Sequence, residues 1–169
     1  MKFLCFVLGA VLCLCVFGSA DAQAETTAQA GFDQLRSLVG QWKARTPDGK
    51  TATITYRLVS AGSVLLEEEN LAEGISMITM YHLDGDRLML THYCAAKNQP
   101  RMRADLAGSR AEELRFNFLD ATNLVDPNAG HMRSVILRIR DKDHMIQEWT
   151  FRKDGKDGPP EVFEYDRVR

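Results

Sequence analysis

The residues best suited to chemistry lie mid-chain, where His92 and Cys94 stand two positions apart in an apolar, strand-like segment. Alternate side chains of a β-strand share one face, so these two side chains would point the same way. Imidazole and thiolate groups suit zinc or copper, and His131 is a candidate third ligand. The spacing supports a metal site only weakly, because the chain has neither a C-x-x-C pair nor an H-E-x-x-H motif. We therefore assign no metal ligands and no cofactor, and keep a metal- or haem-binding barrel as an alternative.

The same residues also offer a nucleophile and a base. Cys94 pairs with His92 or His131 in this hypothesis, and Asp120 would orient the base. Another set of acid–base candidates in a barrel interior is Tyr93, Arg101 and Glu148. The chain has no G-x-S-x-G motif, no phosphate-binding glycine loop and no paired-carboxylate signature. We therefore assign no catalytic residue and expect binding rather than catalysis.

A hairpin around Asp84-Gly85 orients the central residues. Asp-Gly between two alternating apolar segments is a strong signal for a β-hairpin. With these two residues as the loop, one face of the hairpin is the more apolar, and we place it inward. This face carries Met77, Thr79, Tyr81, Leu83, Leu88, Leu90, His92 and Cys94.

The inward face predicts a small-molecule site. A cavity with apolar walls and a few convergent polar groups is its usual form, and His92 and Gln147 would orient the ligand. The strand that follows Gly130 would turn Arg133 and Val135 inward, with His131 near a rim. The alternative is an interior filled by side chains, which holds nothing. The predicted ligand-binding residues are Tyr81, His92, Tyr93, Cys94, Arg101, Phe116, His131, Gln147 and Trp149.

Three polar segments bear on this prediction. Residues 94–101 form either a rim loop, in which Arg101 pairs with a ligand carboxylate, or a plain hairpin loop with a surface arginine. The acidic triplet 67–69 is a candidate binding patch, but we interpret it as the solvent side and end of a strand. The long connection 120–130 is the candidate lid.

These side chains must be positioned by a series of short strands. From Trp42 onward, about ten alternating segments are separated by turn residues at intervals of roughly 8–12 residues. Before them, apolar residues from Phe32 to Val39 recur at helical spacing, and Gly40 is a natural stop. No second helical pattern is present, which makes parallel βαβ units improbable. The pattern is typical of an antiparallel barrel or sandwich.

Trp42 and Arg167 favour the barrel. Trp42 opens the first strand and Arg167 lies in the last, and a barrel closed on itself brings these strands together. Arg167 would then lie across the Trp42 indole in a cation–π contact worth ~0.5–2 kcal/mol. We assign both residues to structural closure, although Trp42 is also interpretable as a plain core residue.

The helix, Gly40-x-Trp42 and the closing Arg167 resemble the calycins, which include lipocalins and fatty-acid-binding-protein-like barrels. Residues 38–42, 91–94 and 98–102 resemble, more closely, an uncharacterised family of secreted bacterial lipocalin-like proteins. The resemblance covers nearly the whole chain after residue 22. It implies an all-β, antiparallel up-and-down barrel of about ten strands, with a short N-terminal helix plugging one end. It also implies a small apolar molecule held inside, although the family has no established substrate and fold does not determine function.

The N-terminus has the pattern of a secretory signal peptide. Lys2 precedes an apolar run from Phe3 to Phe17, and small residues follow, so cleavage after Ala22 or Ala24 fits equally well. The alternative is a membrane anchor, but the run is shorter than the ~20 residues that span a bilayer. We predict a signal peptide at 1–22, a flexible tail at 23–31 and one barrel domain at 32–169, secreted or periplasmic.

The composition limits the kinds of binding partner that we expect. The net charge is −2 and no basic stripe is present, so we expect no nucleic-acid partner. Cys94 is the only one of the four cysteines outside the predicted signal peptide, so no internal disulfide forms. We expect a monomer without a stable membrane anchor, whose partner is a small apolar or amphipathic molecule.

Overall fold

The computed structural model describes residues 22–45, 49, 51–71, 74–107 and 112–169. The predicted signal peptide lies almost wholly outside the described residues. Among the described residues, no helix is long and apolar enough to cross a membrane.

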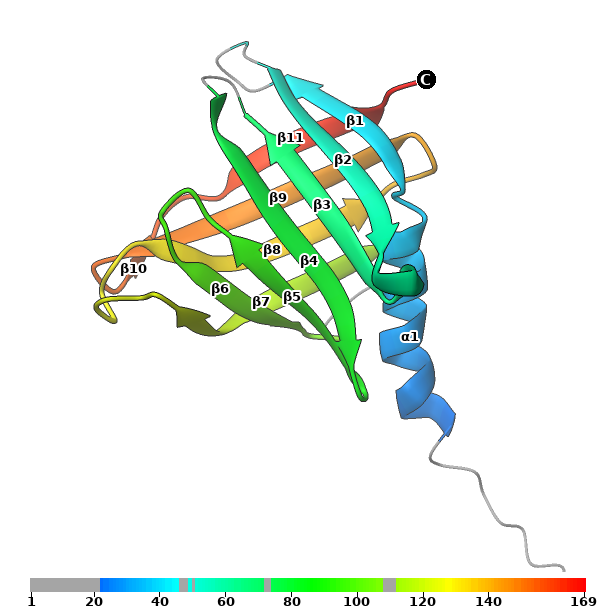
Figure 1. Ribbon diagram of the computed structural model, residues 1–169, viewed down its shortest axis with the longest axis horizontal. Coiled ribbons are helices and arrows are strands. Elements are labelled where there is room, and N and C mark those ends of the chain that lie inside the picture. The colour runs from blue at the N-terminus through cyan, green and yellow to red at the C-terminus, as the bar shows by residue number, and fades with distance from the viewer. Residues whose placement is uncertain (1–21, 46–48, 50, 72–73, 108–111) are drawn as a thin grey trace, which may run out of the picture.

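One helix precedes the strands of a single sheet (Figure 1). The elements are α1 (Ala22–Arg36), β1 (Gly40–Arg45), β2 (Thr51–Val59), the 3-10 turn η1 (Ser60–Gly62), β3 (Val64–Asn70), β4 (Ser76–Asp84), β5 (Arg87–Tyr93), β6 (Gln99–Ala104), β7 (Glu113–Thr122), β8 (His131–Ile139), β9 (His144–Lys153), β10 (Lys156–Asp157) and β11 (Glu161–Arg167).

The sheet closes on itself as an antiparallel up-and-down barrel. Strands β1 to β9 each pair with the next, and β11 joins β9 to β1. The two-residue β10 pairs with β9 just before β11 begins. Across the described residues, ten strands without β10 therefore form the closed ring, as the sequence predicts.

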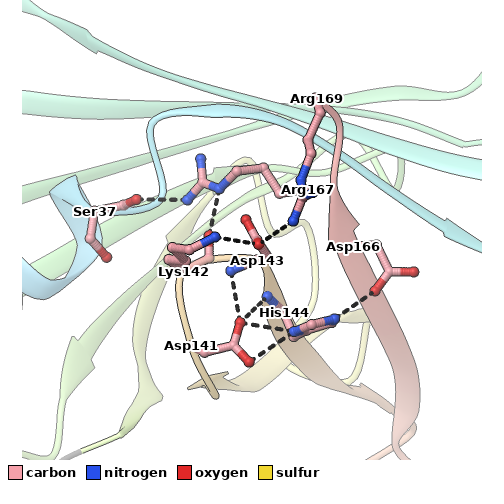
Figure 2. Close-up of polar contacts among 8 residues, drawn as sticks. All are labelled: Ser37, Asp141, Lys142, Asp143, His144, Asp166, Arg167 and Arg169. Carbon is pink, nitrogen blue, oxygen red and sulfur yellow. Dashed lines mark hydrogen bonds and ion pairs between the residues drawn. The ribbon is translucent and has the colours of Figure 1, made fainter.

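Trp42 and Arg167 close the ring between β1 and β11. The two residues are register partners, and the Arg167 guanidinium lies 4.1 Å from the centre of the buried Trp42 indole. This is the contact that the sequence analysis expects. Arg167 also donates hydrogen bonds to the carbonyls of Ser37 and Lys142 at 2.9 and 2.6 Å (Figure 2). A third bond goes to the Val39 carbonyl at 2.7 Å. One arginine thus ties the helix end to the first strand, the last strand and the β8–β9 turn.

The helix is longer at its start than the apolar spacing predicts. It begins at Ala22 rather than Phe32 and ends at Arg36 rather than Val39, so residues 23–31 continue α1 where a flexible tail was expected. Alanine recurs through 22–30, and its high helix propensity extends a helix without an apolar stripe. Phe32 and Leu35 are buried against the barrel, so α1 packs at one end of it (Figure 1).

The β4–β5 hairpin turns at Gly85-Asp86, one residue later than predicted, because Asp84 pairs with Arg87. The register moves by two residues, so every side chain keeps its predicted face. Thr79 is consequently the partner of His92.

A β-bulge in β8 changes another prediction. The register shifts between Met132 and Ser134, which leaves Arg133 as the extra residue. Met132, the partner of Phe151, packs against the core, whereas His131 pairs with Arg152. At the bulge the inward series of Val135 therefore passes to Met132, while His131 is buried against Phe118.

Candidate functional site

Two acidic side chains face the barrel interior, contrary to the sequence interpretation. Glu67 and Glu69 are only 1% and 4% exposed, whereas Glu68 between them is half-buried on the other face. The inward alternation of β3 starts at Leu65 and continues through both carboxyl groups. The acidic triplet is therefore not simply the solvent side of a strand.

Glu67 is surrounded by hydrogen-bond donors from three other strands. Its carboxylate accepts bonds from Thr79 Oγ1 at 3.3 Å, Tyr81 OH at 2.9 Å and Gln147 Nε2 at 3.0 Å. The Tyr56 hydroxyl also bonds to it, and Gln147 Nε2 bonds to that hydroxyl at 2.8 Å. Burial raises the pKa of Glu67, while these four partners favour the charged carboxylate and act in the opposite direction.

His92 extends this network on one side. It is 1% exposed, its Nδ1 lies 2.9 Å from Thr79 Oγ1, and its ring centre is 4.8 Å from that of Trp149. Burial lowers the pKa of His92 to about 4, so its ring is neutral at pH 7. Its other nitrogen, Nε2, is buried and has no hydrogen-bond partner within the described chain.

Glu69 lies two residues farther along β3. The Tyr165 hydroxyl donates to its Oε1 at 2.9 Å. Burial, followed by the charge of Glu67, raises the pKa of Glu69 to about 7. None of the ion pairs between described residues includes Glu67 or Glu69. The interior thus holds two carboxyl groups balanced by neutral donors rather than by cations.

Several predicted site residues meet in this network. Tyr81, His92 and Gln147 are buried around Glu67, and Trp149 Nε1 donates to Gln147 Oε1 at 2.8 Å. Phe116 packs edge-on against Tyr81, with ring centres 5.7 Å apart. These five residues from four strands line one continuous interior region.

Other predicted residues lie elsewhere. Tyr93 is 45% exposed, because it follows inward-facing His92 and therefore points outward. Arg101 is exposed and donates to Asp120, with Nε 2.6 Å from Oδ1. This pair lowers the pKa of Asp120 and commits that carboxylate to Arg101 rather than to a base near Cys94. Neither Tyr93 nor Arg101 faces the interior site.

The hypothesis of a metal site also fails. His131 is buried, but its Nδ1 bonds to the Ala129 carbonyl at 2.8 Å and its ring lies 4.6 Å from Phe118. In the part of the chain that the structure describes, no group of three His, Cys, Asp or Glu side chains is placed to hold a metal ion. His92, Cys94 and His131 therefore do not form a ligand set.

Cys94 does not have the environment of an activated nucleophile. Its half-buried thiol has a raised pKa, mainly because of burial, and the charge of Glu69 adds to the effect. A raised pKa keeps the thiol protonated, whereas nucleophilic cysteines need a lowered one. The structure gives no support to a Cys94–histidine pair.

Sequence reasoning missed the acidic centre of the site. The sequence interpretation places Glu67 and Glu69 toward solvent, and the buried hydroxyls of Tyr56 and Tyr165 are not among the predicted site groups. One available signal was the alternation that begins at Leu65, since it puts both glutamates on the apolar face. The preference of carboxylates for solvent outweighed that signal.

Comparison with known proteins identifies the fold but no family. No profile of a known protein family matches the chain, and no curated protein matches it. Among solved structures, it is similar to a protein of unknown function from the DUF3598 family of Nostoc punctiforme PCC 73102. The TM-score is 0.54 at 13% sequence identity, and the match covers 79% of this chain and 49% of the Nostoc protein. The chain thus spans about half the length of that protein, and the likeness concerns the barrel fold alone.

Proposed function

We propose that this protein is an exported binding protein that holds a small apolar or amphipathic ligand inside its barrel. The observation that carries the proposal is the buried Nε2 atom of His92, which has no hydrogen-bond partner in the described chain. A buried polar atom without a partner costs about 1–3 kcal/mol. A ligand whose polar end reached Nε2 would remove this cost while its apolar part packed beside Trp149.

The end of the barrel away from α1 supplies the entrance in this proposal. Inner side chains at that end, such as Met132 and Phe163, are half-buried and pack against the core from its edge. Near the helix, inner side chains such as Leu88 and Leu65 are fully buried. A ligand would therefore enter at the end opposite α1 and meet the polar network partway down.

In this proposal the apolar part of the ligand lies beside two small residues. Ala44 and Ala52 are register partners on β1 and β2, and both are buried. Small side chains side by side leave more interior volume than two large ones. Small-molecule sites combine such apolar space with a few polar groups, as at His92 and Gln147. The calycin resemblance supports the same function, since those barrels hold small apolar molecules inside.

A filling variant tests the proposal directly. We expect the fluorescence of N-phenylnaphthylamine, a neutral apolar dye, to rise on binding to the native protein and not to the Ala52→Phe variant. The matched control is Thr53→Phe, which adds the same ring to the next residue on the outer face of β2. Circular dichroism verifies folding, because overpacking costs about 1–3 kcal/mol. Equal dye binding by both variants, or no binding by the native protein, would contradict the proposal.

Export has its own test. Protein expressed from the full chain and recovered from the periplasm of a bacterial host should begin at Gln23 or Glu25, as N-terminal sequencing would show. Protein retaining Met1 to Phe17 in that fraction would contradict a cleaved signal peptide.

A further inference from the structure

The buried polar atoms that lack a hydrogen-bond partner in the described interior are acceptors. Thr79 has a single hydroxyl proton and two neighbours, Glu67 Oε1 at 3.3 Å and His92 Nδ1 at 2.9 Å. The Thr79 hydroxyl donates its proton to Glu67 Oε1. Neutral His92 must then donate from Nδ1 to Thr79 Oγ1, which leaves Nε2 as a bare acceptor.

A second buried atom without a partner is also an acceptor. Asn98, in the turn after β5, donates from Nδ2 to the Gly130 carbonyl at 2.8 Å, and this bond determines the orientation of its amide. Its Oδ1 is buried and has no partner within the described residues. The turn that carries Asn98 lies at the end of the barrel opposite α1, on the same side as Glu69.

The two carboxyl groups add negative charge to these acceptors. Glu67 and Glu69 are two residues apart on the inner face of β3, and their hydrogen-bond partners among the described residues are all neutral. A buried carboxylate without a cation is costly, because neutral donors replace only part of its hydration. Glu69 has the fewer donors of the two and lies nearer the entrance.

From this arrangement we propose that the ligand is a cationic amphiphile, a primary amine with an apolar tail, whose ammonium group binds the Glu69 carboxylate and His92 Nε2. An ammonium group has three donors and no acceptor, which matches a site with acceptors and negative charge to spare. An alcohol supplies one donor without the charge, and a fatty acid would bring a third carboxyl group. This inference rests on the proposed function and specifies its ligand.

Proton release should accompany binding. An ammonium group beside Glu69 favours the charged carboxylate, so a protonated Glu69 loses its proton when the amine binds. The groups that act on Glu69 are Glu67 on β3, Tyr165 and Glu161 on β11, Tyr81 on β4, and Cys94 after β5. None of them is a cation that competes with the amine.

The experiment compares decylamine, decanol and decanoate, which share one chain length, in displacing N-phenylnaphthylamine at pH 7. We expect decylamine to bind about tenfold more tightly than decanol, because charge-assisted hydrogen bonds are roughly twice as strong as neutral ones. Calorimetry in two buffers of different ionisation enthalpy should detect release of about half a proton. In the native protein, decylamine affinity should also rise between about pH 6 and about pH 8, while decanol affinity stays constant.

Adjacent glutamates give the matched pair of variants. Glu69→Gln should abolish the preference for decylamine, whereas Glu68→Gln, on the other face of the same strand, should retain it. If decanol or decanoate binds as tightly as decylamine, or if the preference survives Glu69→Gln, the amine inference is wrong while the barrel remains a binding protein. If neither the dye nor any of the three compounds binds, both the inference and the proposed function fail.

Discussion

The closed end around Trp42 and Arg167 and the polar interior around Glu67 and His92 use hydrogen bonds differently. At the closed end, Trp42 Nε1 donates to the Leu38 carbonyl at 2.7 Å and Arg167 bonds to three further carbonyls. In the interior, many bonds are also made, yet His92 Nε2 has no partner in the part of the chain that the structure describes. A structural joint is most stable when all of its hydrogen-bonding groups are paired, whereas a binding site needs hydrogen-bonding groups that are still available to a ligand.

The two regions also differ in their response to pH. At the closed end, Arg167 bonds to backbone carbonyls, which do not titrate. The interior contains Glu69, with a pKa of about 7, and His92, with a pKa of about 4. The closed end should therefore hold the barrel at any working pH, while the interior changes its charge.

Removal of the Trp42 side chain should have the largest effect. Trp42→Ala should lower the free energy of unfolding by about 3–5 kcal/mol, since a fully buried indole is lost from the joint between helix and strands. Denaturant titration measures the change. Lys43→Ala, one residue along and outward-facing, should cost no more than about 0.5 kcal/mol. A small loss for Trp42→Ala would show that the closed end does not stabilise the barrel.

The pH dependence of stability should show two opposing contributions of up to about 3 kcal/mol each. Glu69 binds its proton more tightly when folded, so its contribution to stability falls as pH rises from about 4.5 to about 7. His92 binds its proton less tightly when folded, so its contribution grows as pH rises from about 4 to about 6.5.

Single variants separate these contributions. In denaturant titrations across this pH range, Glu69→Gln should leave a stability that rises with pH, and His92→Phe should leave one that falls. Identical profiles for the two variants would contradict the burial of both groups.

Arg167→Lys should cost about 2 kcal/mol, because lysine keeps the charge but cannot reach three carbonyls with one planar group. Thermal and denaturant unfolding measure the loss. Arg169→Lys, two residues later and exposed, should be nearly neutral, since its partner is Asp143 on the surface. Equal losses of stability in the two variants would show that Arg167 does not stabilise the joint between the helix and the barrel.

His92→Phe should have the smallest effect on stability, within about 1 kcal/mol at pH 7, because it removes an unpartnered nitrogen together with one hydrogen bond. The same variant should bind decylamine more weakly than the native protein does. Fluorescence displacement and denaturant titration on one preparation would show whether binding and stability separate. A large loss of stability with unchanged binding would make His92 a structural residue.

The hairpin shows how far alternation carries a prediction. The loop was placed one residue early, yet Tyr81 and His92 were assigned correctly to the interior, because a register shift of two residues preserves the face. In β8 the extra residue Arg133 shifts the alternation, so Met132 packs against the core where the sequence predicts Arg133. A register error of two residues leaves each side chain on its predicted face, whereas an error of one residue moves it to the other face. A bulge causes such an error and has no clear sequence signal.

What the sequence by itself determined is the periodic part of this protein: the short alternating strands, the helix before them and the closing pair of Trp42 and Arg167. Those features depend on local spacing and on a rule that a closed barrel joins its first strand to its last. The tertiary structure decided that Glu67 and Glu69 face inward, where the alternation of β3 and the preference of carboxylates for solvent disagree. A carboxyl group is stable there because Tyr81, Gln147 and Tyr165 converge on this pair from distant strands. These side chains meet because the barrel closes, and the spacing of neighbouring residues does not predict such contacts between distant strands.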